Sequence, residues 1–132
     1  MISKAEMMEP MLEACPSFRP AWEWFVEEWR LQDDKPLYLA LSNLARHLIA
    51  ILAARDTTTL SRVFAVVERW HLEGDAYVRE AATVGLLEDL QNENLHVSTA
   101  AKDVEAFLQP ESSKWWGKVE RSWIRRKIIS DD

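Results

Sequence analysis

Apolar residues recur at helical spacing along most of this chain, and no segment predicts a strand. Trp22, Phe25, Val26 and Trp29 follow one another at i, i+3, i+4 and i+7, which is typical of an amphipathic helix. Segment 37–53 is apolar over most of its circumference, so we expect it to lie at the centre of the fold. The pattern predicts seven helices, near residues 3–14, 20–31, 36–54, 57–73, 75–90, 98–109 and 112–129.

Residues with strong preferences for helix ends mark these boundaries. Ser3 and Glu6 form a capping-box pattern, and Pro20 suits the first turn of the second helix. Gly74 suits the position after the fourth helix, and Asp75 suits the N-cap of the fifth. For the last two helices we expect Ser98 or Thr99 to begin the sixth, Pro110 to end it, and Ser112 or Ser113 to begin the seventh.

The composition agrees with one all-α domain spanning residues 1–132. The chain is 48% hydrophobic and 29% charged, so it can bury a core and is not disordered. It contains only 3 Gly and 5 Pro, too few for the many turns of an all-β fold. No apolar run approaches the ~20 residues of a membrane-spanning helix, and the first six residues lack the apolar segment of a secretory signal. We therefore predict a cytoplasmic, compact bundle of about six or seven helices.

The aromatic residues predict both a core and an exposed surface. Of the 7 tryptophans, Trp22, Trp29 and Trp70 lie in apolar stripes, so we expect them in the core. Trp24 lies off its stripe, and the adjacent pair Trp115 and Trp116 cannot face the same way. At least one of these last three should therefore be partly exposed, as interface anchors often are.

The segment from Asp75 to Leu86 resembles the second helix of a HEAT repeat. An Asp opens the helix, the Val78-Arg79 pair follows, and two alanines allow close helix packing. Gly85 within the same helix predicts the close approach of a neighbouring helix. The longer segment 74–92 also resembles a small all-helical bacterial family of unknown function. Proteins of this kind are often encoded beside polymorphic toxins, so the resemblance implies an immunity protein.

Charge is distributed unevenly along the chain, whose formal net charge is -6. Residues 1–113 contain 10 basic and 19 acidic residues, whereas residues 114–129 contain 6 basic residues and one acidic residue. The acidic balance disfavours a general nucleic-acid binder. It serves either solubility and packing or, in the sharper interpretation, an acidic surface that attracts a basic partner.

From these features we predict a non-enzymatic, protein-binding immunity protein that docks on the basic cleft of a cognate toxin. We expect no cofactor, no nucleic acid and no membrane as partners, and the sequence is compatible with a homodimer. The candidate partner-binding residues are Asp75, Glu80, Glu88, Asp89 and Glu93 around the fifth helix, and Glu23, Glu27, Asp33 and Asp34 nearer the N-terminus.

Two other binding functions fit the sequence. The first is a HEAT-like adaptor or scaffold domain. The second is binding to nucleic acid or a membrane surface through the basic seventh helix, where cations at i, i+4, i+7 and i+11 lie beside tryptophans. These cations are Lys114, Lys118, Arg121 and Arg125. The alternative for this helix is that its tryptophans seal the core while its cations face water or pair with the acidic body.

Candidates for catalysis are few, and we expect no catalytic residue and no metal site. Two Glu-x-x-His pairs have the spacing of di-iron ligands, but we expect both pairs, Glu68/His71 and Glu93/His96, to be ordinary solvated surface residues. Cys15 has no activating motif and is expected to pack as a small hydrophobe. His47 is expected to be a satisfied histidine at a helix edge, and the chain has no Gly-rich phosphate-binding loop.

Overall fold

The computed structural model describes the backbone of residues 1–131 and the side chains of residues 1–124, and over that range the protein is all-α. It has no strand in residues 1–131 apart from one isolated bridge between Ile2 and Gly74. The helices are α1 (Met8–Ala14), η1 (Pro16–Phe18), α2 (Arg19–Glu28), α3 (Leu37–Ala53), α4 (Thr57–Glu73), α5 (Ala76–Glu80), η2 (Ala81–Leu87), α6 (Glu88–Leu90), η3 (Glu93–Leu95), η4 (Ala101–Phe107) and α7 (Pro110–Asp131). The predicted fold class is confirmed.

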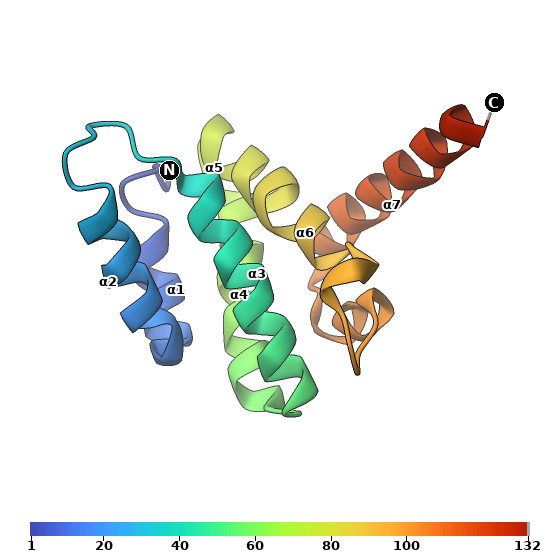
Figure 1. Ribbon diagram of the computed structural model, residues 1–132, viewed down its shortest axis with the longest axis horizontal. Helices are drawn as coiled ribbons and strands as arrows, with labels where there is room; N and C mark the ends of the chain where they lie inside the picture. Colours follow the sequence, from blue (N-terminus) through green and yellow to red (C-terminus); the bar gives the residue numbers. More distant parts are fainter. Residues whose placement is uncertain (132) are drawn as a thin grey trace.

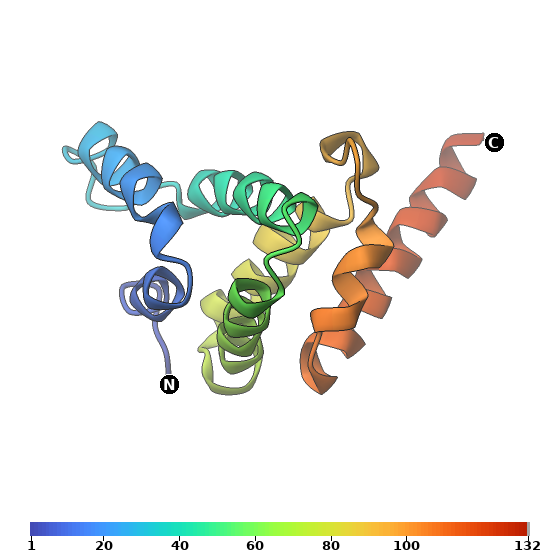
Figure 2. The ribbon, with the colours of Figure 1, turned by 90° about the horizontal axis from the view of Figure 1, so that it is seen from below.

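The helices are arranged around a central pair, α3 and α4 (Figures 1 and 2). α1 and α2 lie at one end of the molecule, and η4 and α7 lie at the other. α5, η2 and α6 form one continuous helix in which η2 is a π-helical segment. The most extensive contact between elements joins η2 to α3. The C-terminal part of α7 extends away from the other helices (Figure 1).

Close approaches occur at two glycines, and the one at Gly85 was predicted. A Cβ on Gly85 would lie 2.8 Å from Leu41 Cδ1, so the glycine lets the π segment pack against α3. A Cβ on Gly74 would lie 2.3 Å from the Trp70 carbonyl oxygen. Gly74 has an extended backbone with φ -73°, so it is required here by close approach and not by the left-handed conformation expected of a C′ glycine.

The chain start is fastened to the turn between α4 and α5. The Ile2 N–H donates to the Glu73 carbonyl at 2.7 Å, and the Asp75 N–H donates to the Ile2 carbonyl at 2.9 Å. The first helix therefore begins at Met8 and not at Ser3, which corrects our prediction. Glu6 does accept the Ser3 N–H, but the Ser3 hydroxyl donates to the same carboxylate instead of capping the backbone, so residues 4–6 form a turn.

The tryptophans differ widely in burial. Trp70 is fully buried, and its indole N–H donates to the Met7 carbonyl at 2.9 Å. Trp22 and Trp29, which we expected in the core, are only half-buried because α2 lies at the edge of the molecule. Trp24 is 69% exposed, and Trp116 is buried whereas Trp115 is half-buried, as the sequence predicted for these three.

The boundary between the last two helical segments differs from the prediction. The sixth segment, η4, is a 3-10 helix, and the Ala100 N–H at its start donates to the Asp103 carboxylate. Pro110 does not end this segment but begins α7, where its missing N–H leaves no donor unpaired. Ser112 is not the N-cap of α7 but lies in its first turn, fully buried.

Glu68 on α4 supplies the cap of α7. Its carboxylate accepts the backbone N–H groups of Glu111 and Ser112 at 3.0 and 2.8 Å, and the Ser112 hydroxyl at 2.9 Å. A carboxylate at a helix N-terminus pairs with free N–H groups and with the positive end of the helix dipole. Burial raises the pKa of Glu68, but the hydrogen bonds from Glu111 and Ser112 outweigh burial, so the pKa lies below its usual range.

His71 extends this network to the π segment. Because the Ser112 hydroxyl donates its proton to Glu68, it must accept from His71 Nδ1–H at 2.9 Å. Nε2 of the neutral ring then accepts from the Thr83 hydroxyl at 3.1 Å. Burial lowers the pKa of His71, opposed in part by the Glu68 carboxylate, so the neutral form is favoured. Our expectation that Glu68 and His71 are solvated was wrong, since they are only 7% and 4% exposed.

Candidate functional site

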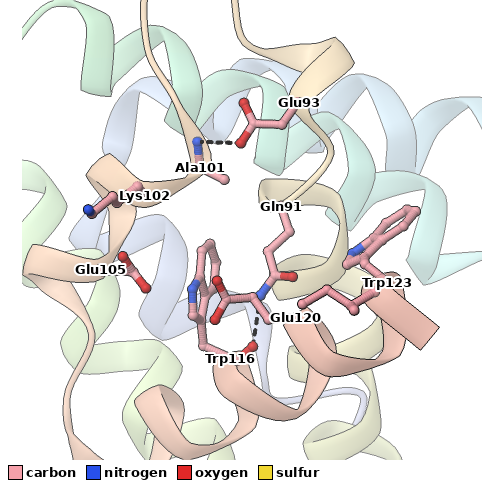
Figure 3. Close-up of a pocket in the computed structure, with 9 residues that line it drawn as sticks. Gln91, Glu93, Ala101, Lys102, Glu105, Trp116, Glu120 and Trp123 are labelled. Atoms are coloured by element: carbon pink, nitrogen blue, oxygen red, sulfur yellow. Dashed lines mark hydrogen bonds between the residues drawn. The ribbon is translucent and has the colours of Figure 1, made fainter. Parts of the chain in front are cut away.

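A cleft of about 440 Å³ opens between α7 and the segment that contains η3 and η4 (Figure 3). α7 places Trp116, Glu120 and Trp123 on the cleft at i, i+4 and i+7, which is one face of a helix. The Glu68 cap fixes the start of α7 and so determines where this face lies. The other lining residues are Gln91, Glu93, Ala101, Lys102, Glu105 and Ile124.

The floor of the cleft has two buried polar atoms without a partner among the described residues. Gln91 and Trp116 are 9% and 3% exposed. Gln91 Nε2 donates to the Trp116 carbonyl oxygen at 2.8 Å, whereas Gln91 Oε1 and Trp116 Nε1 have no hydrogen-bond partner. Buried polar groups are normally paired, so one acceptor and one donor at the floor of the same cleft indicate a ligand or ordered water.

The rim of the cleft is acidic. Glu93, Glu105 and Glu120 are exposed carboxylates, and Lys102 is the one cation among the lining residues. Glu93 uses one carboxylate oxygen to accept the Ala101 N–H at 3.2 Å. The excess of negative charge favours a cationic ligand.

One wall of the cleft is apolar. Trp123 is 37% exposed and Ile124 is 60% exposed, and both lie on the cleft. Indole faces attract cations as well as apolar groups. The arrangement therefore suits a ligand that joins a positive charge to an apolar stem.

The acidic residues predicted around the fifth helix have separate structural surroundings. Glu93 lies on the cleft, and Glu80 is exposed on α5. The Asp75 carboxylate caps α5 by accepting the Val78 N–H at 2.9 Å. Glu88 and Asp89 are half-buried at α6. Burial raises the pKa of Asp89 above its ordinary value. Its hydrogen bond with Ser42 and the charge of Arg46, both on α3, lower the pKa by less than burial raises it.

The N-terminal acidic residues lie at the other end of the molecule. Glu23 and Glu27 are exposed on α2, and Glu27 pairs with Arg30 at 3.4 Å. Asp33 and Asp34 line a second hollow of about 360 Å³, which Trp22 and Phe25 also line, and Asp34 pairs with Lys4. The helices α3 and α4 separate this end from α7 (Figure 1). The structure therefore places the nine predicted residues in several regions and brings Glu93 alone of them to the cleft.

Sequence reasoning missed most of the cleft. Glu105, Glu120 and Gln91 were not selected, because each looks like an ordinary polar residue in the sequence. The spacing of Trp116, Glu120 and Trp123 was an available signal, since it places a carboxylate between two indoles on one helix face. That Glu105 of η4 faces the same cleft, and that the Gln91 amide oxygen is unpaired, could not be found without the fold.

Two cations of α7 lie over the ring of Trp115. Lys114 and Lys118 Nζ lie 5.6 and 4.2 Å from the centre of the Trp115 ring, and Lys114 also pairs with Glu111 at 3.4 Å. The side chain of Arg125, the last cation of the predicted basic stripe, lies outside the described residues, as do those of Arg126 and Lys127.

The candidates for chemistry occupy structural roles. Cys15 is fully buried, as expected of a small packed hydrophobe. His47 Nε2 lies 2.8 Å from Ser17 Oγ. His96 Nε2 donates to the Leu90 carbonyl at 2.9 Å, which fixes the loop after α6. Among the described residues no group of three or more His, Cys, Asp or Glu side chains is placed to hold a metal ion. Nor does any helix in that part of the chain have the length and apolar character needed to cross a membrane.

The structure is a small all-α domain with a cleft beside α7. Comparison with protein families assigns residues 8–124 to a domain of unknown function, DUF7674, and the chain belongs to this family. Comparisons with curated proteins and with solved structures give no match. The resemblance to a helical family of unknown function is thus confirmed at this level, and the immunity role and the HEAT-like likeness stay predictions.

Proposed function

We propose that this protein is a non-enzymatic binding module that holds a basic protein partner in the cleft between α7 and η4, and that it acts as an immunity protein against a toxin. One observation supports the binding site above all: two buried, unpartnered polar atoms lie beneath three carboxylates and beside exposed indole and aliphatic surface. A site of this kind combines the aromatic anchor and the charge complementarity that protein interfaces use.

The charge of the chain supports the choice of a basic partner. The net charge is -6, and the cleft rim adds a local excess of carboxylates. Such a field speeds association with a positively charged surface and repels nucleic acid and anionic lipid. A toxin that acts on nucleic acid has a basic substrate-binding surface, and a protein that covers this surface blocks it. The inference of a toxin in particular comes from the sequence resemblance described above.

Affinity capture followed by a growth assay tests this function. The protein is used as bait in nuclease-treated lysate of the source cell, and bound proteins are identified by mass spectrometry. We expect one basic, stoichiometric partner that inhibits growth when expressed alone and is harmless when the two proteins are expressed together. Loss of all binding after nuclease treatment would contradict the proposal and favour nucleic-acid binding through α7. A partner that is harmless alone would contradict the immunity role and favour an adaptor.

A further inference from the structure

We propose that the cleft recognises an arginine side chain together with one main-chain carbonyl of the segment that presents it. This inference rests on the proposed function for the source of the arginine, a surface loop of the partner protein. The recognition itself depends on residues of this chain alone.

The floor requires a ligand that both donates and accepts. The amide of Gln91 has a fixed orientation, because its Nε2 donates to the Trp116 carbonyl, which can only accept. Gln91 Oε1 is left as an acceptor and Trp116 Nε1 as a donor, both buried. In Figure 3 the Gln91 amide lies between the two indoles. Both atoms are already shielded from water without a partner, so a guanidinium N–H and a peptide carbonyl would each supply a missing hydrogen bond, which an apolar ligand cannot do.

The rim and the walls favour arginine over lysine. A guanidinium has five N–H donors in a plane, so it can donate to more than one acceptor at once, and the acceptors that line the cleft include Gln91, Glu105 and Glu120. The flat faces of a guanidinium stack on an exposed indole such as that of Trp123. An ammonium group concentrates its donors at one strongly hydrated point and has no face to stack. A carboxylate or phosphate ligand is repelled by the three glutamates of the rim.

Peptide titrations of the whole protein test this recognition. The probe is the tripeptide Gly-Arg-Gly with acetylated and amidated ends, and the readout is the ¹H–¹⁵N resonance of the Trp116 indole. We expect saturable shifts with a dissociation constant of about 1 mM, as suits one side chain and one carbonyl. The matching lysine peptide should bind at least about fivefold more weakly because it has no bidentate fork. The uncharged citrulline peptide should not bind measurably.

Exposed glutamates of the rim provide variants that leave the core intact. Glu105→Gln and Glu120→Gln should each weaken the arginine peptide about three- to tenfold by removing a charge-assisted hydrogen bond. Glu13→Gln is the matched control, because Glu13 is exposed on α1 at the opposite end of the molecule, and it should leave the titration unchanged. Circular dichroism checks that all three variants keep the helical fold.

Three results would overturn the inference. They are a Trp116 indole resonance that does not respond to the arginine peptide, an equal response to the lysine peptide, and a response that survives both glutamine substitutions. The titration contains no partner protein, so its failure leaves the binding function to be judged by affinity capture. Conversely, an unsuccessful capture leaves a positive titration as evidence for arginine recognition.

Discussion

The cap that Glu68 places on α7 gives the sharpest prediction about stability. In Glu68→Gln the side chain keeps its shape, and its remaining oxygen can still accept the Ser112 N–H and hydroxyl. The other oxygen becomes an NH₂ group, which cannot accept the Glu111 N–H that is now 3.0 Å from it. The substitution therefore removes one hydrogen bond to a charged acceptor and the charge at the helix N-terminus, with little change in packing.

The size of the effect follows from these losses. A hydrogen bond to a charged group contributes about 1.5–3 kcal/mol, and a charge near a helix terminus contributes about 0.3–1 kcal/mol. We expect Glu68→Gln to lower the free energy of unfolding by about 2–3 kcal/mol at pH 7. Glu73→Gln is the matched control on the same helix. Its carboxylate makes an exposed pair with Arg69, and its loss should cost about 0.5 kcal/mol or less.

Urea unfolding followed by circular dichroism measures these differences, and pH separates charge from shape. The pKa of Glu68 is lower in the folded protein than its ordinary value of 4.5, so its contribution is complete above that value. The contribution decreases as the pH falls through the lowered folded pKa. Wild type and Glu68→Gln should therefore converge in strong acid. A variant within about 0.5 kcal/mol of wild type at pH 7, or a difference that does not change with pH, would refute the capping role.

Three further predictions concern stability. Gly117→Ala should stabilise the protein by about 0.5–1 kcal/mol, because the new Cβ meets only Arg121 Nη1 at 3.5 Å. Gly74→Ala should instead destabilise it by more than about 2 kcal/mol, because the new Cβ would collide with the Trp70 carbonyl oxygen. Urea midpoints that shift in the same direction for both variants would contradict this contrast. Gly85→Ala should destabilise the protein by about 1 kcal/mol in the same assay, although alanine has the higher helix propensity, because the new Cβ displaces the buried Leu41 side chain. A gain in stability would contradict this prediction and show that the core can rearrange at little cost. Burial lowers the pKa values of His71 and His47, so the folded protein favours their neutral forms. Their contribution to the free energy of unfolding should therefore be complete above about pH 6.5 and decrease as the pH falls below that value. A free energy of unfolding that stays constant between pH 7 and 5 would disprove this.

Local sequence signals predicted the helices well where apolar spacing and capping agree. The stripe of α3 and the cap Asp75 placed central helices close to their observed ends. The signals failed at Pro110 and Ser112, where the cap of α7 comes from Glu68, which is distant in sequence. A tertiary cap leaves no mark near the helix that it stabilises, so the boundary could not be found from neighbouring residues.

The candidate site was harder to predict than the fold. An acidic surface was inferred from net charge, but charge alone does not say which carboxylates gather. Glu93, Glu105 and Glu120 come from three different segments and meet only when α7 lies along η4. The buried atoms of Gln91 and Trp116 are recognisable as unpaired only when their surroundings are known.

The affinity of the captured partner for cleft variants tests the central claim most directly. Isothermal titration calorimetry compares wild type, the double variant Glu105→Gln/Glu120→Gln and the control Glu13→Gln. The account predicts that the double variant binds at least about tenfold more weakly, and that the control binds like wild type. Equal affinities for all three proteins would contradict the account and show that the partner binds elsewhere.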